Sequence, residues 1–252
     1  MPETQKVAFH TLGCKVNQHD SAIMAALFQD AGYEVVDFND LADVYVVNTC
    51  TVTHLSDRKS RQMIRHAARE NPAATIVVCG CYAQTAKAEL EALTRWILSS
   101  APTSVTRSWK RSRLFRRDHV KTAYMADDEE LFYYEDLPHE RVSGMTRAYV
   151  KIQEGCDQFC AYCAIPYARG PLRSRSEQDT IDEINMLVER GYKEVILTGI
   201  HIGPTAAASR MKPAISPGSA VAFSTKQRSN GCASVLSRHR GDRRTHRDDR
   251  QR

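Results

Sequence analysis

The stretch that decides the fold of this chain is Arg147–Cys163, with the sequence RAYVKIQEGCDQFCAYC. It begins with an apolar, strand-like run, and the loop that follows carries three cysteines spaced four and then three residues apart, Cys156, Cys160 and Cys163. Thiolates are the usual ligands of iron–sulfur clusters, and a 4Fe–4S cube normally takes four of them. Three closely spaced thiols without a local fourth therefore favour a cube in which one iron stays open.

Two other kinds of site remain open for these thiols. A catalytic zinc ion also takes three protein ligands and leaves one position open. Structural zinc sites pair C-x-x-C units, however, and this stretch holds a single such unit, Cys160–Cys163. Cysteine is also a small hydrophobic residue that packs in protein cores. The pattern favours the open cluster over both alternatives.

The order C-x-x-x-C-x-x-C, with the aromatic Tyr162 before its last cysteine, resembles the radical S-adenosylmethionine (SAM) signature. The longer string Gly155–Gly170, which ends in IPYARG, resembles the methylthiotransferase branch of those enzymes. The resemblance implies that the open iron chelates SAM and that an electron from the cluster cleaves SAM to a 5′-deoxyadenosyl radical. Such chemistry belongs to the cofactor, which the protein positions. It also implies that Tyr162 lies over the SAM adenine, while Arg169 either neutralises a carboxylate or braces the loop.

Residues 1–93 alternate between strand and helix patterns. Helical spacing of apolar residues predicts a helix over Ser21–Ala31, with Asp20 or Ser21 as its cap. The other predicted helices are Thr53–Glu70 and Gln84–Leu93, and the predicted strands are Lys6–His10, Tyr33–Phe38, Val44–Val47 and Thr75–Val78. This alternation predicts an α/β domain with a doubly wound, Rossmann- or flavodoxin-like parallel sheet. Ligands of such sheets collect outside the carboxyl ends of the strands.

Three more cysteines follow three different predicted strands of this domain, and they are Cys14, Cys50 and Cys81. Because the carboxyl ends of parallel strands share one edge of the sheet, we expect these residues to meet there. The alternative is burial in the core, which we assign to Cys79 because it lies inside a predicted strand.

The N-terminal motifs also resemble the methylthiotransferases, which implies a second 4Fe–4S cluster on Cys14, Cys50 and Cys81. The strings GCKVNQ at Gly13–Gln18 and LTGIHIG at Leu197–Gly203 look most like the subgroup that acts on N6-threonylcarbamoyladenosine in tRNA. This resemblance implies radical abstraction at C2 of the adenine, sulfur insertion and S-methylation from a second SAM. It also implies a tRNA anticodon loop as substrate and an electron donor such as flavodoxin or ferredoxin. A non-catalytic iron–sulfur carrier or scaffold and a methylthiotransferase acting on a ribosomal protein are the alternatives.

Composition adds bounds on the class of protein. A chain of 252 residues holds one to two domains. The sequence lacks an apolar span long enough for a membrane and a charged-then-apolar leader, so we expect a cytoplasmic protein without membrane contact. Eight cysteines in such a protein point to metal binding or catalysis rather than disulfides. The net charge of +5 is carried by two basic segments, residues 94–117 and 204–252, and the remainder is acidic.

These observations predict the following organisation. Residues 1–117 form the N-terminal domain, of which 94–117 are atypical, and 118–141 form an acidic linker. Residues 142–203 begin a radical SAM domain, with a helix at Ser176–Arg190 and a strand at Glu194–Thr198. Both basic segments, residues 94–117 and the tail 204–252, are expected to be translated out of frame, with disorder or an RNA-binding arm as alternatives. The radical SAM partial (β/α) barrel is thus expected to be incomplete, and the chain to be inactive in this truncated form.

Overall fold

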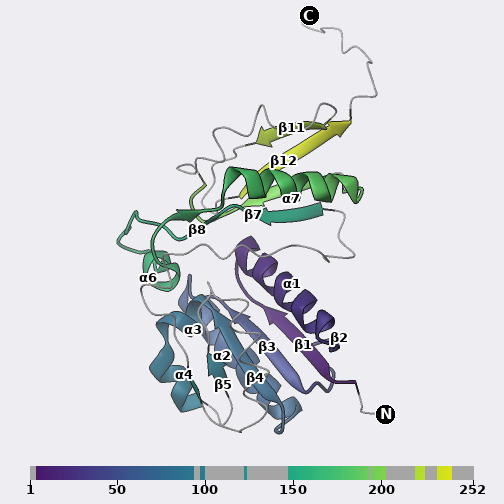
Figure 1. Ribbon diagram of the computed structural model, residues 1–252. Coiled ribbons are helices and arrows are strands. Elements are labelled where there is room, and N and C mark those ends of the chain that lie inside the picture. Colours follow the sequence, from purple (N-terminus) through teal and green to yellow (C-terminus); the bar gives the residue numbers. More distant parts are fainter. Residues whose placement is uncertain are drawn as a thin grey trace, which may run out of the picture.

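The computed structural model describes residues 4–93, 97–99, 122–123, 147–192, 194–202, 219–224 and 232–239 (Figure 1). The N-terminal part contains the strands β1 (Lys6–Thr11), β2 (Glu34–Val36), β3 (Val44–Thr49), β4 (Thr75–Gly80), β5 (Ile97–Ser99) and β6 (Thr122–Ala123), and the helices α1 (Lys15–Asp30), α2 (His54–Glu70), α3 (Cys81–Thr85) and α4 (Lys87–Leu93). The C-terminal part contains β7 (Arg147–Lys151), β8 (Gln153–Glu154), α6 (Ile165–Arg169), β9 (Arg173–Ser174), α7 (Glu177–Glu189), β10 (Glu194–Thr198), β11 (Ser219–Ser224) and β12 (Cys232–His239).

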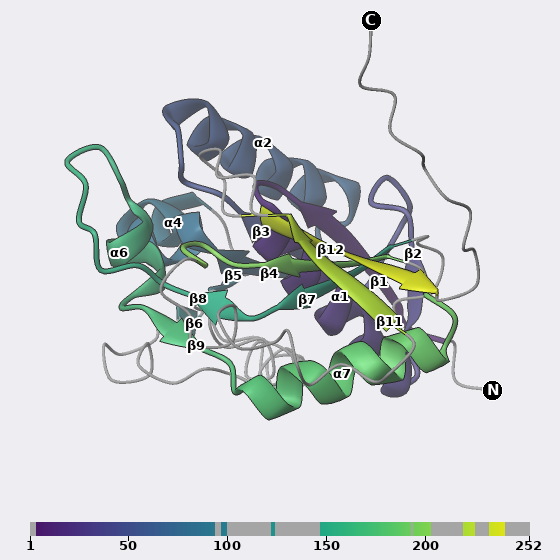
Figure 2. The same ribbon diagram turned by 90° about the horizontal axis from the view of Figure 1, so that it is seen from above.

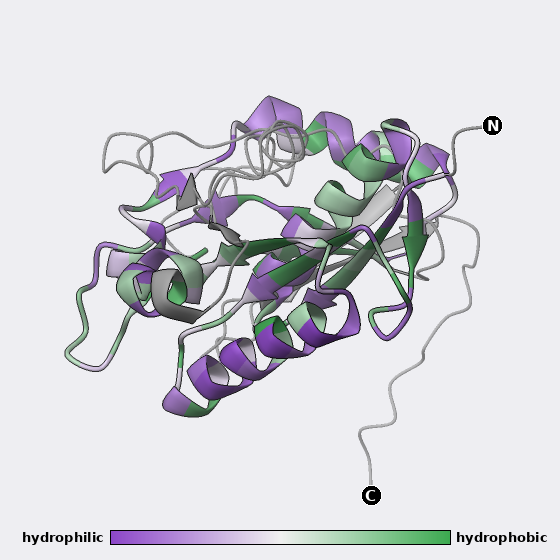
Figure 3. Ribbon diagram, turned by 90° about the horizontal axis from the view of Figure 1, so that it is seen from below, coloured by the Kyte–Doolittle hydropathy of each residue, from purple (hydrophilic) through white to green (hydrophobic). Residues whose placement is uncertain are grey.

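The N-terminal sheet has the strand order β2-β1-β3-β4-β5-β6, and all its pairings are parallel. Helix α1 packs on one face, where Ile23 and Phe28 contact a layer that includes Val44 and Val46. Helix α2 packs on the other face, where Ile64 joins a layer that includes Tyr45. Because both faces are covered, β3 is buried at every position, as strands of doubly wound sheets are. Figure 3 shows the hydrophobic strands between helices whose outward sides are hydrophilic. The predicted doubly wound parallel sheet is confirmed.

Two helix boundaries differ from the prediction. Helix α1 begins at Lys15, so Asp20 and Ser21 lie inside it, and the interpretation of either residue as its cap was wrong. The polar run from Lys15 to Ser21 hid this first part of the helix from a search for apolar spacing. The predicted helix Gln84–Leu93 is two short helices, α3 and α4. Helix α2 begins where expected, because the side chain of Thr53 accepts a hydrogen bond from the backbone of Ser56.

The C-terminal part is built on one β/α unit. Strands β7 and β10 are parallel neighbours, and α7 packs Ile184 and Leu187 against Val150 and Leu197. Strand β12 pairs antiparallel with β10, and β11 pairs antiparallel with β12. This unit corresponds to the start of the predicted partial (β/α) barrel. Apart from β11 and β12, the predicted tail lies outside the described residues, and the predicted linker is described only at β6, which extends the N-terminal sheet.

The two parts of the chain lie against each other. Helix α1 contacts β7, and α3 contacts α6 (Figures 1 and 2). This arrangement brings the cysteine loop between β8 and α6 to the carboxyl edge of the N-terminal sheet. Within the described ranges, none of the helices has the length and apolar character that a membrane span requires.

Candidate functional site

The three N-terminal cysteines lie at one edge of the parallel sheet, as predicted from their positions after strands. Cys14 immediately precedes α1, Cys50 follows β3, and Cys81 is the first residue of α3 after β4. Cys50 and Cys81 are buried and Cys14 is exposed. Cys79 lies inside β4 and packs in the core layer under α1, which confirms its interpretation as a packing residue.

Two glycines let the backbone before Cys14 and Cys81 approach the segment that carries Cys50. Gly13 has a φ of 100°, and a Cβ placed on it would lie 2.8 Å from Cys50 Cβ and 3.0 Å from Cys50 Sγ. Gly80 has a φ of 89°, and a Cβ there would overlap the carbonyl oxygen of Thr49. Both positions therefore need glycine, for the positive φ and for the close approach. The three cysteines lie close together because the segments that carry them pack so tightly that neither Gly13 nor Gly80 leaves room for a Cβ.

Side-chain amides hold this edge in place. Asn17 Nδ2 donates hydrogen bonds to the carbonyl oxygens of Leu12 (2.7 Å) and Thr49 (2.9 Å). Asn48 Nδ2 donates to the carbonyl of Asn17 (2.9 Å) and to Ser21 Oγ (3.0 Å). Hydrogen bonds of Asn17 and Asn48 thus hold the loop that carries Cys14 against the loop that carries Cys50.

The second cysteine set lies in the loop between β8 and α6. The backbone N–H of Cys156 donates to the carbonyl of Gly170 (3.1 Å), which closes the loop at its base, and that of Cys163 donates to the carbonyl of Cys160 (2.9 Å). Cys156 is buried, Cys163 is partly exposed and Cys160 is exposed. This loop therefore presents Cys160 and Cys163 toward the surface, while Cys156 lies buried at its base.

The aromatic residues of the cysteine loop face outward. Tyr162 is 92% exposed, and Phe159 and Tyr167 form an edge-to-face pair with ring centroids 5.8 Å apart. The role of Tyr162 against the SAM adenine stays a prediction. His201 lies next to the first cysteine of the loop, with its Nδ1 4.0 Å from Cys156 Sγ. Gln153 Oε1 holds this segment by accepting the backbone N–H of His201 at 2.7 Å.

The donor chemistry of the two sets fits iron–sulfur clusters. Among the residues that the structure describes, no three His, Cys, Asp or Glu side chains lie close enough together to hold a single metal ion. An iron–sulfur cube contains several irons, so its thiolate ligands stand further apart than those of one zinc ion. Each set supplies cysteine thiols alone, held on loops whose backbones are fixed by glycine contacts or hydrogen bonds. The cysteines present are therefore suited to clusters better than to mononuclear zinc.

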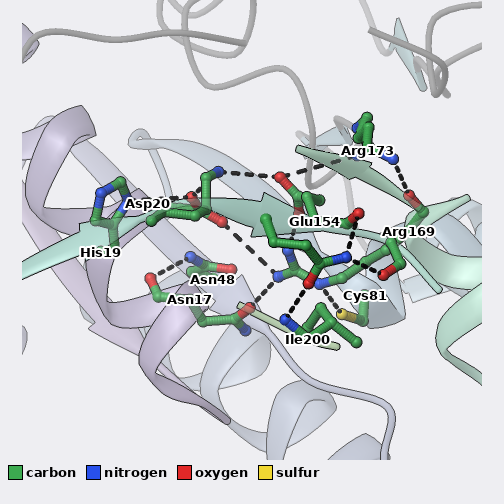
Figure 4. Close-up of polar contacts among 12 residues, drawn as sticks. Asn17, His19, Asp20, Asn48, Cys81, Glu154, Arg169, Arg173 and Ile200 are labelled. Atoms are coloured by element: carbon green, nitrogen blue, oxygen red, sulfur yellow. Dashed lines mark hydrogen bonds and ion pairs between the residues drawn. The ribbon is translucent and has the colours of Figure 1, made fainter. Parts of the chain in front are cut away.

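A buried polar network joins the two parts of the chain next to Cys81, and Arg169 is its centre (Figure 4). Arg169 is fully buried. Its Nε donates to Cys81 Sγ at 3.2 Å, its Nη1 donates to Glu154 Oε1, and its Nη2 donates to Asn17 Oδ1. Although burial disfavours the charge, Cys81, Glu154 and Asp20 hold the pKa of Arg169 well above its usual value.

Two carboxylates and a lysine complete the network. Lys151 Nζ lies 2.7 Å from Asp20 Oδ1 and 3.0 Å from Glu154 Oε2. Burial raises the pKa of both carboxyls, but Lys151 and Arg169 outweigh it and hold each pKa below its usual range. Burial also raises the pKa of the Cys81 thiol to about 11, against the opposing effect of Arg169. A bound metal deprotonates a coordinating thiol outright, so this thiol becomes a thiolate when a cluster binds.

Most of this network was missed by sequence reasoning. Arg169 was singled out, but Asn17, Asp20, Lys151 and Glu154 were not. The only signals were a lysine inside an apolar strand and two polar residues three apart on a helix. Neither signal indicates which residues pair with one another, because the partners come from distant parts of the chain.

Two family models match the chain, one over the part that carries the first cysteine set and one over the part that carries the second. Residues 6–99 match the family described as uncharacterized protein family UPF0004, and residues 150–203 match the radical SAM superfamily. The chain is 46% identical over 197 residues to threonylcarbamoyladenosine tRNA methylthiotransferase MtaB of Bacillus subtilis, which covers 78% of this chain and 44% of that protein. It is 42% identical over 200 residues to the protein of the same name from Aquifex aeolicus, with 78% and 48% covered.

A second group of relatives, less similar to this chain, is named for a different modified nucleoside. The chain is 33% identical over 213 residues to tRNA-2-methylthio-N(6)-dimethylallyladenosine synthase of Bacillus licheniformis, covering 80% of this chain and 40% of that protein. The chain thus spans less than half the length of these curated relatives.

A solved structure supports the fold. The chain resembles the radical SAM methyltransferase TsrM from Kitasatospora setae with a TM-score of 0.56 and 14% identity, over 81% of this chain and 49% of that one. A likeness at this identity bears on the fold alone. The chain thus matches the UPF0004 and radical SAM families in this order, and over most of its length it is similar to curated tRNA methylthiotransferases.

Proposed function

We propose that this chain is part of a tRNA methylthiotransferase that converts N6-threonylcarbamoyladenosine to its 2-methylthio derivative. The observation that carries the proposal is the presence of two separate three-cysteine sets, one on each part of the chain, with Arg169 of the second part hydrogen-bonded to Cys81 of the first set. Each set has one thiol fewer than the four that hold the 4Fe–4S cube of a simple electron carrier. The relatives at 46% and 42% identity are named as threonylcarbamoyladenosine tRNA methylthiotransferases, which supports N6-threonylcarbamoyladenosine as the substrate.

The residues divide between two cofactor sites. Cys156, Cys160 and Cys163 would hold the 4Fe–4S cluster that binds SAM, and Cys14, Cys50 and Cys81 would hold a second 4Fe–4S cluster. When bound, these groups supply the radical that removes the hydrogen at C2 of the adenine and the sulfur that replaces it. The chain itself fixes the geometry: the contact between Cys156 and Gly170 closes the SAM-side loop, and the contacts of Gly13 and Gly80 seat the other set. Tyr162, an exposed residue of the same loop, would cover a bound SAM.

A basic helix beside the cysteine edge supports RNA as the partner. Five of the eight Lys and Arg residues in residues 1–93 lie on α2, although this region as a whole is acidic. Arg58, Lys59, Arg65 and Arg69 are exposed on it. The helix starts four residues after Cys50, so its positive face leads away from the proposed cluster site. Phosphate contacts from such a face position an RNA without reading its sequence.

The experiment that tests the proposal compares substrates. The complete protein that contains this chain is reconstituted anaerobically and incubated with SAM, a low-potential reductant and one of three substrates: tRNA carrying N6-threonylcarbamoyladenosine, tRNA carrying N6-dimethylallyladenosine, or a ribosomal protein. The 252-residue chain alone, which we expect to be inactive, is tested beside it. Nucleoside and peptide mass spectrometry should detect the 2-methylthio group in the first sample and not in the others. In cells of the source organism, deletion of the gene should remove 2-methylthio-N6-threonylcarbamoyladenosine from tRNA. Retention of that nucleoside, or modification of another substrate, would contradict the assignment.

An electron donor such as flavodoxin or ferredoxin and a cytoplasmic location follow from this proposal, because the reaction needs low-potential electrons and its substrate is tRNA. Both stay predictions. Fractionation of the cell and reduction of the bound clusters by purified donor proteins would check them.

A further inference from the structure

Arg169 is fixed to the SAM-side cysteine loop by its backbone. It is the last residue of α6 and lies six residues after Cys163. Its carbonyl oxygen accepts a hydrogen bond from Arg173 Nη1 at 2.7 Å, and the next residue, Gly170, accepts the backbone N–H of Cys156 at 3.1 Å. Any shift of the loop therefore moves the backbone of Arg169.

The side chain of Arg169 leaves the loop and ends in the other domain. Its Nε donates to Cys81 Sγ, its Nη2 donates to Asn17, and its Nη1 donates to Glu154 (Figure 4). A planar guanidinium has donors in three directions, so one side chain can hold a sulfur, an amide and a carboxylate together. A lysine has no fixed fork and cannot satisfy all three in this geometry.

The contact with Cys81 is what Arg169 alone contributes among the basic side chains of this network. The carboxylates of Asp20 and Glu154 already have Lys151 at 2.7 and 3.0 Å. Arg173 Nη2 also lies 3.8 Å from Glu154 Oε2. Charge neutralisation is thus shared by several residues, whereas Arg169 supplies the hydrogen bond to Cys81 Sγ.

A donor to a cluster thiolate has a known physical consequence. Hydrogen bonds to the sulfurs and nearby charge are among the factors that set the reduction potential of an iron–sulfur cluster. The reduced cluster is more negative, so a cationic donor stabilises the reduced form more than the oxidised form and raises the potential. The effect is strong at this position because Arg169 and Cys81 are both buried, away from the screening of water.

We propose that Arg169 is a positioning residue that couples the two cluster sites: it anchors the SAM-side loop and, through its hydrogen bond to Cys81, raises the reduction potential of the N-terminal cluster. The proposal rests on the proposed function in that it takes Cys81 as a cluster ligand. Because the same guanidinium anchors the SAM-side loop and donates to Cys81, a shift of this loop would change the reduction potential of the N-terminal cluster.

The test measures potentials in the full chain with both clusters reconstituted. EPR-monitored redox titrations compare the unchanged chain with Arg169→Gln, Arg169→Lys and the control Arg173→Gln. The control removes a buried arginine whose guanidinium binds the carbonyl of Arg169 and lies near the same Glu154, whereas the hydrogen bond to Cys81 Sγ comes from Arg169. The N-terminal cluster is identified from its spectrum in a chain with Cys156, Cys160 and Cys163 replaced by alanine.

We expect Arg169→Gln to lower the potential of the N-terminal cluster by the equivalent of at least a tenfold change in its reduction equilibrium, about 59 mV for one electron. Arg169→Lys should give a smaller shift in the same direction, because it keeps the charge and loses the aligned donor. Arg173→Gln should leave the potential unchanged. Equal shifts in Arg169→Gln and Arg173→Gln, or no shift in either Arg169 variant, would overturn the proposal.

A second readout covers the case in which Arg169→Gln disturbs folding. Hydrogen exchange of the apo chain should show faster exchange at the amides of Cys156 and Cys163 in both Arg169 variants, since the anchor is weakened. If the lysine variant folds and exchanges like the unchanged chain, the anchoring role is wrong. Failure of the unchanged chain to bind any cluster would instead refute the proposed function, so the two outcomes are distinguishable.

Discussion

Lys151 Nζ lies 2.7 Å from Asp20 Oδ1, although the two residues are 131 positions apart in the sequence. One is in β7 of the C-terminal part, the other is in α1 of the N-terminal part, and both are buried. A buried charge is costly unless it is paired. Each part of the chain therefore contributes one member of a buried ion pair, which favours this placement of the two parts relative to each other.

The first prediction concerns this ion pair. Replacing Asp20 by Asn or Lys151 by Met should each destabilise the chain by about 1–3 kcal/mol, because the remaining charge loses its shortest contact, although Lys151 keeps Glu154 and Asp20 keeps Arg169. The double variant should cost less than the sum of the two single variants, since it removes both members of the pair. Urea unfolding of the apo chain measures all three. Additive single effects would mean that the two side chains do not interact.

The second prediction concerns pH. Although burial raises it, the pKa of Asp20 is held below its usual value of 3.8 by Lys151, His19 and Arg169. A depressed carboxyl pKa contributes stability that is fully present above the unfolded pKa and is lost as pH falls toward the folded pKa. The difference in unfolding free energy between the unchanged chain and Asp20→Asn should thus be constant from pH 7 to about 5 and shrink below about pH 4. A difference that stays constant down to pH 3 would contradict this.

The sequence predicted the N-terminal sheet well because its strands are buried on both faces and its helices alternate with them. The convergence of Cys14, Cys50 and Cys81 could be predicted as well, since the carboxyl ends of parallel strands share an edge. The network around Arg169 could not. Its members are ordinary polar residues in their own segments, and only the packing of α1 against β7 brings Asp20 to Lys151. For the same reason the start of α1 was misplaced, because its polar first turns face this network rather than an apolar core.

The third prediction tests the close packing of the cysteine edge. Gly80→Ala should destabilise the chain by about 2–5 kcal/mol, from a left-handed φ and from overlap with Thr49. It should also reduce iron bound at the N-terminal set, because Cys81 is displaced. Gly32→Ala is the matched control: its φ of 87° is nearly the same, but nothing lies within 4 Å of an added Cβ. The control should cost only about 1 kcal/mol and keep its iron; equal losses in both variants would place the effect in the backbone angle alone.

The fourth prediction separates the two cysteine sets. Replacing Cys156, Cys160 and Cys163 together by alanine should remove about four of about eight bound irons and leave the other cube intact. The reason is that the sets lie on different parts of the chain and each has its own thiols. Iron analysis with Mössbauer spectroscopy provides the count. Loss of all iron from a variant that keeps its circular dichroism would show one shared site, and a single tightly bound zinc in the unchanged chain would contradict both clusters.

The last prediction concerns the basic face of α2 and rests on the proposed RNA substrate. Arg58 and Arg65 are exposed on this helix. Each phosphate contact contributes about 0.7 to the slope of log K against log salt on a single strand, and about 0.9 on a duplex. Replacing both arginines by Gln should therefore weaken tRNA binding at low salt and reduce the magnitude of the slope by about 1.5. Fluorescence anisotropy of labelled tRNA over a range of salt concentrations measures both quantities.

Lys87→Gln serves as the control for this experiment, because Lys87 is an exposed cation of the same domain that lies on α4 instead of α2. If binding depends only on total charge, Lys87→Gln should reduce the slope by half as much as the double variant. If α2 makes the phosphate contacts, Lys87→Gln should leave the slope unchanged. A salt slope that the double variant does not alter would mean that the positive face of α2 is simply solvated, and the RNA would then have to lie elsewhere on the molecule.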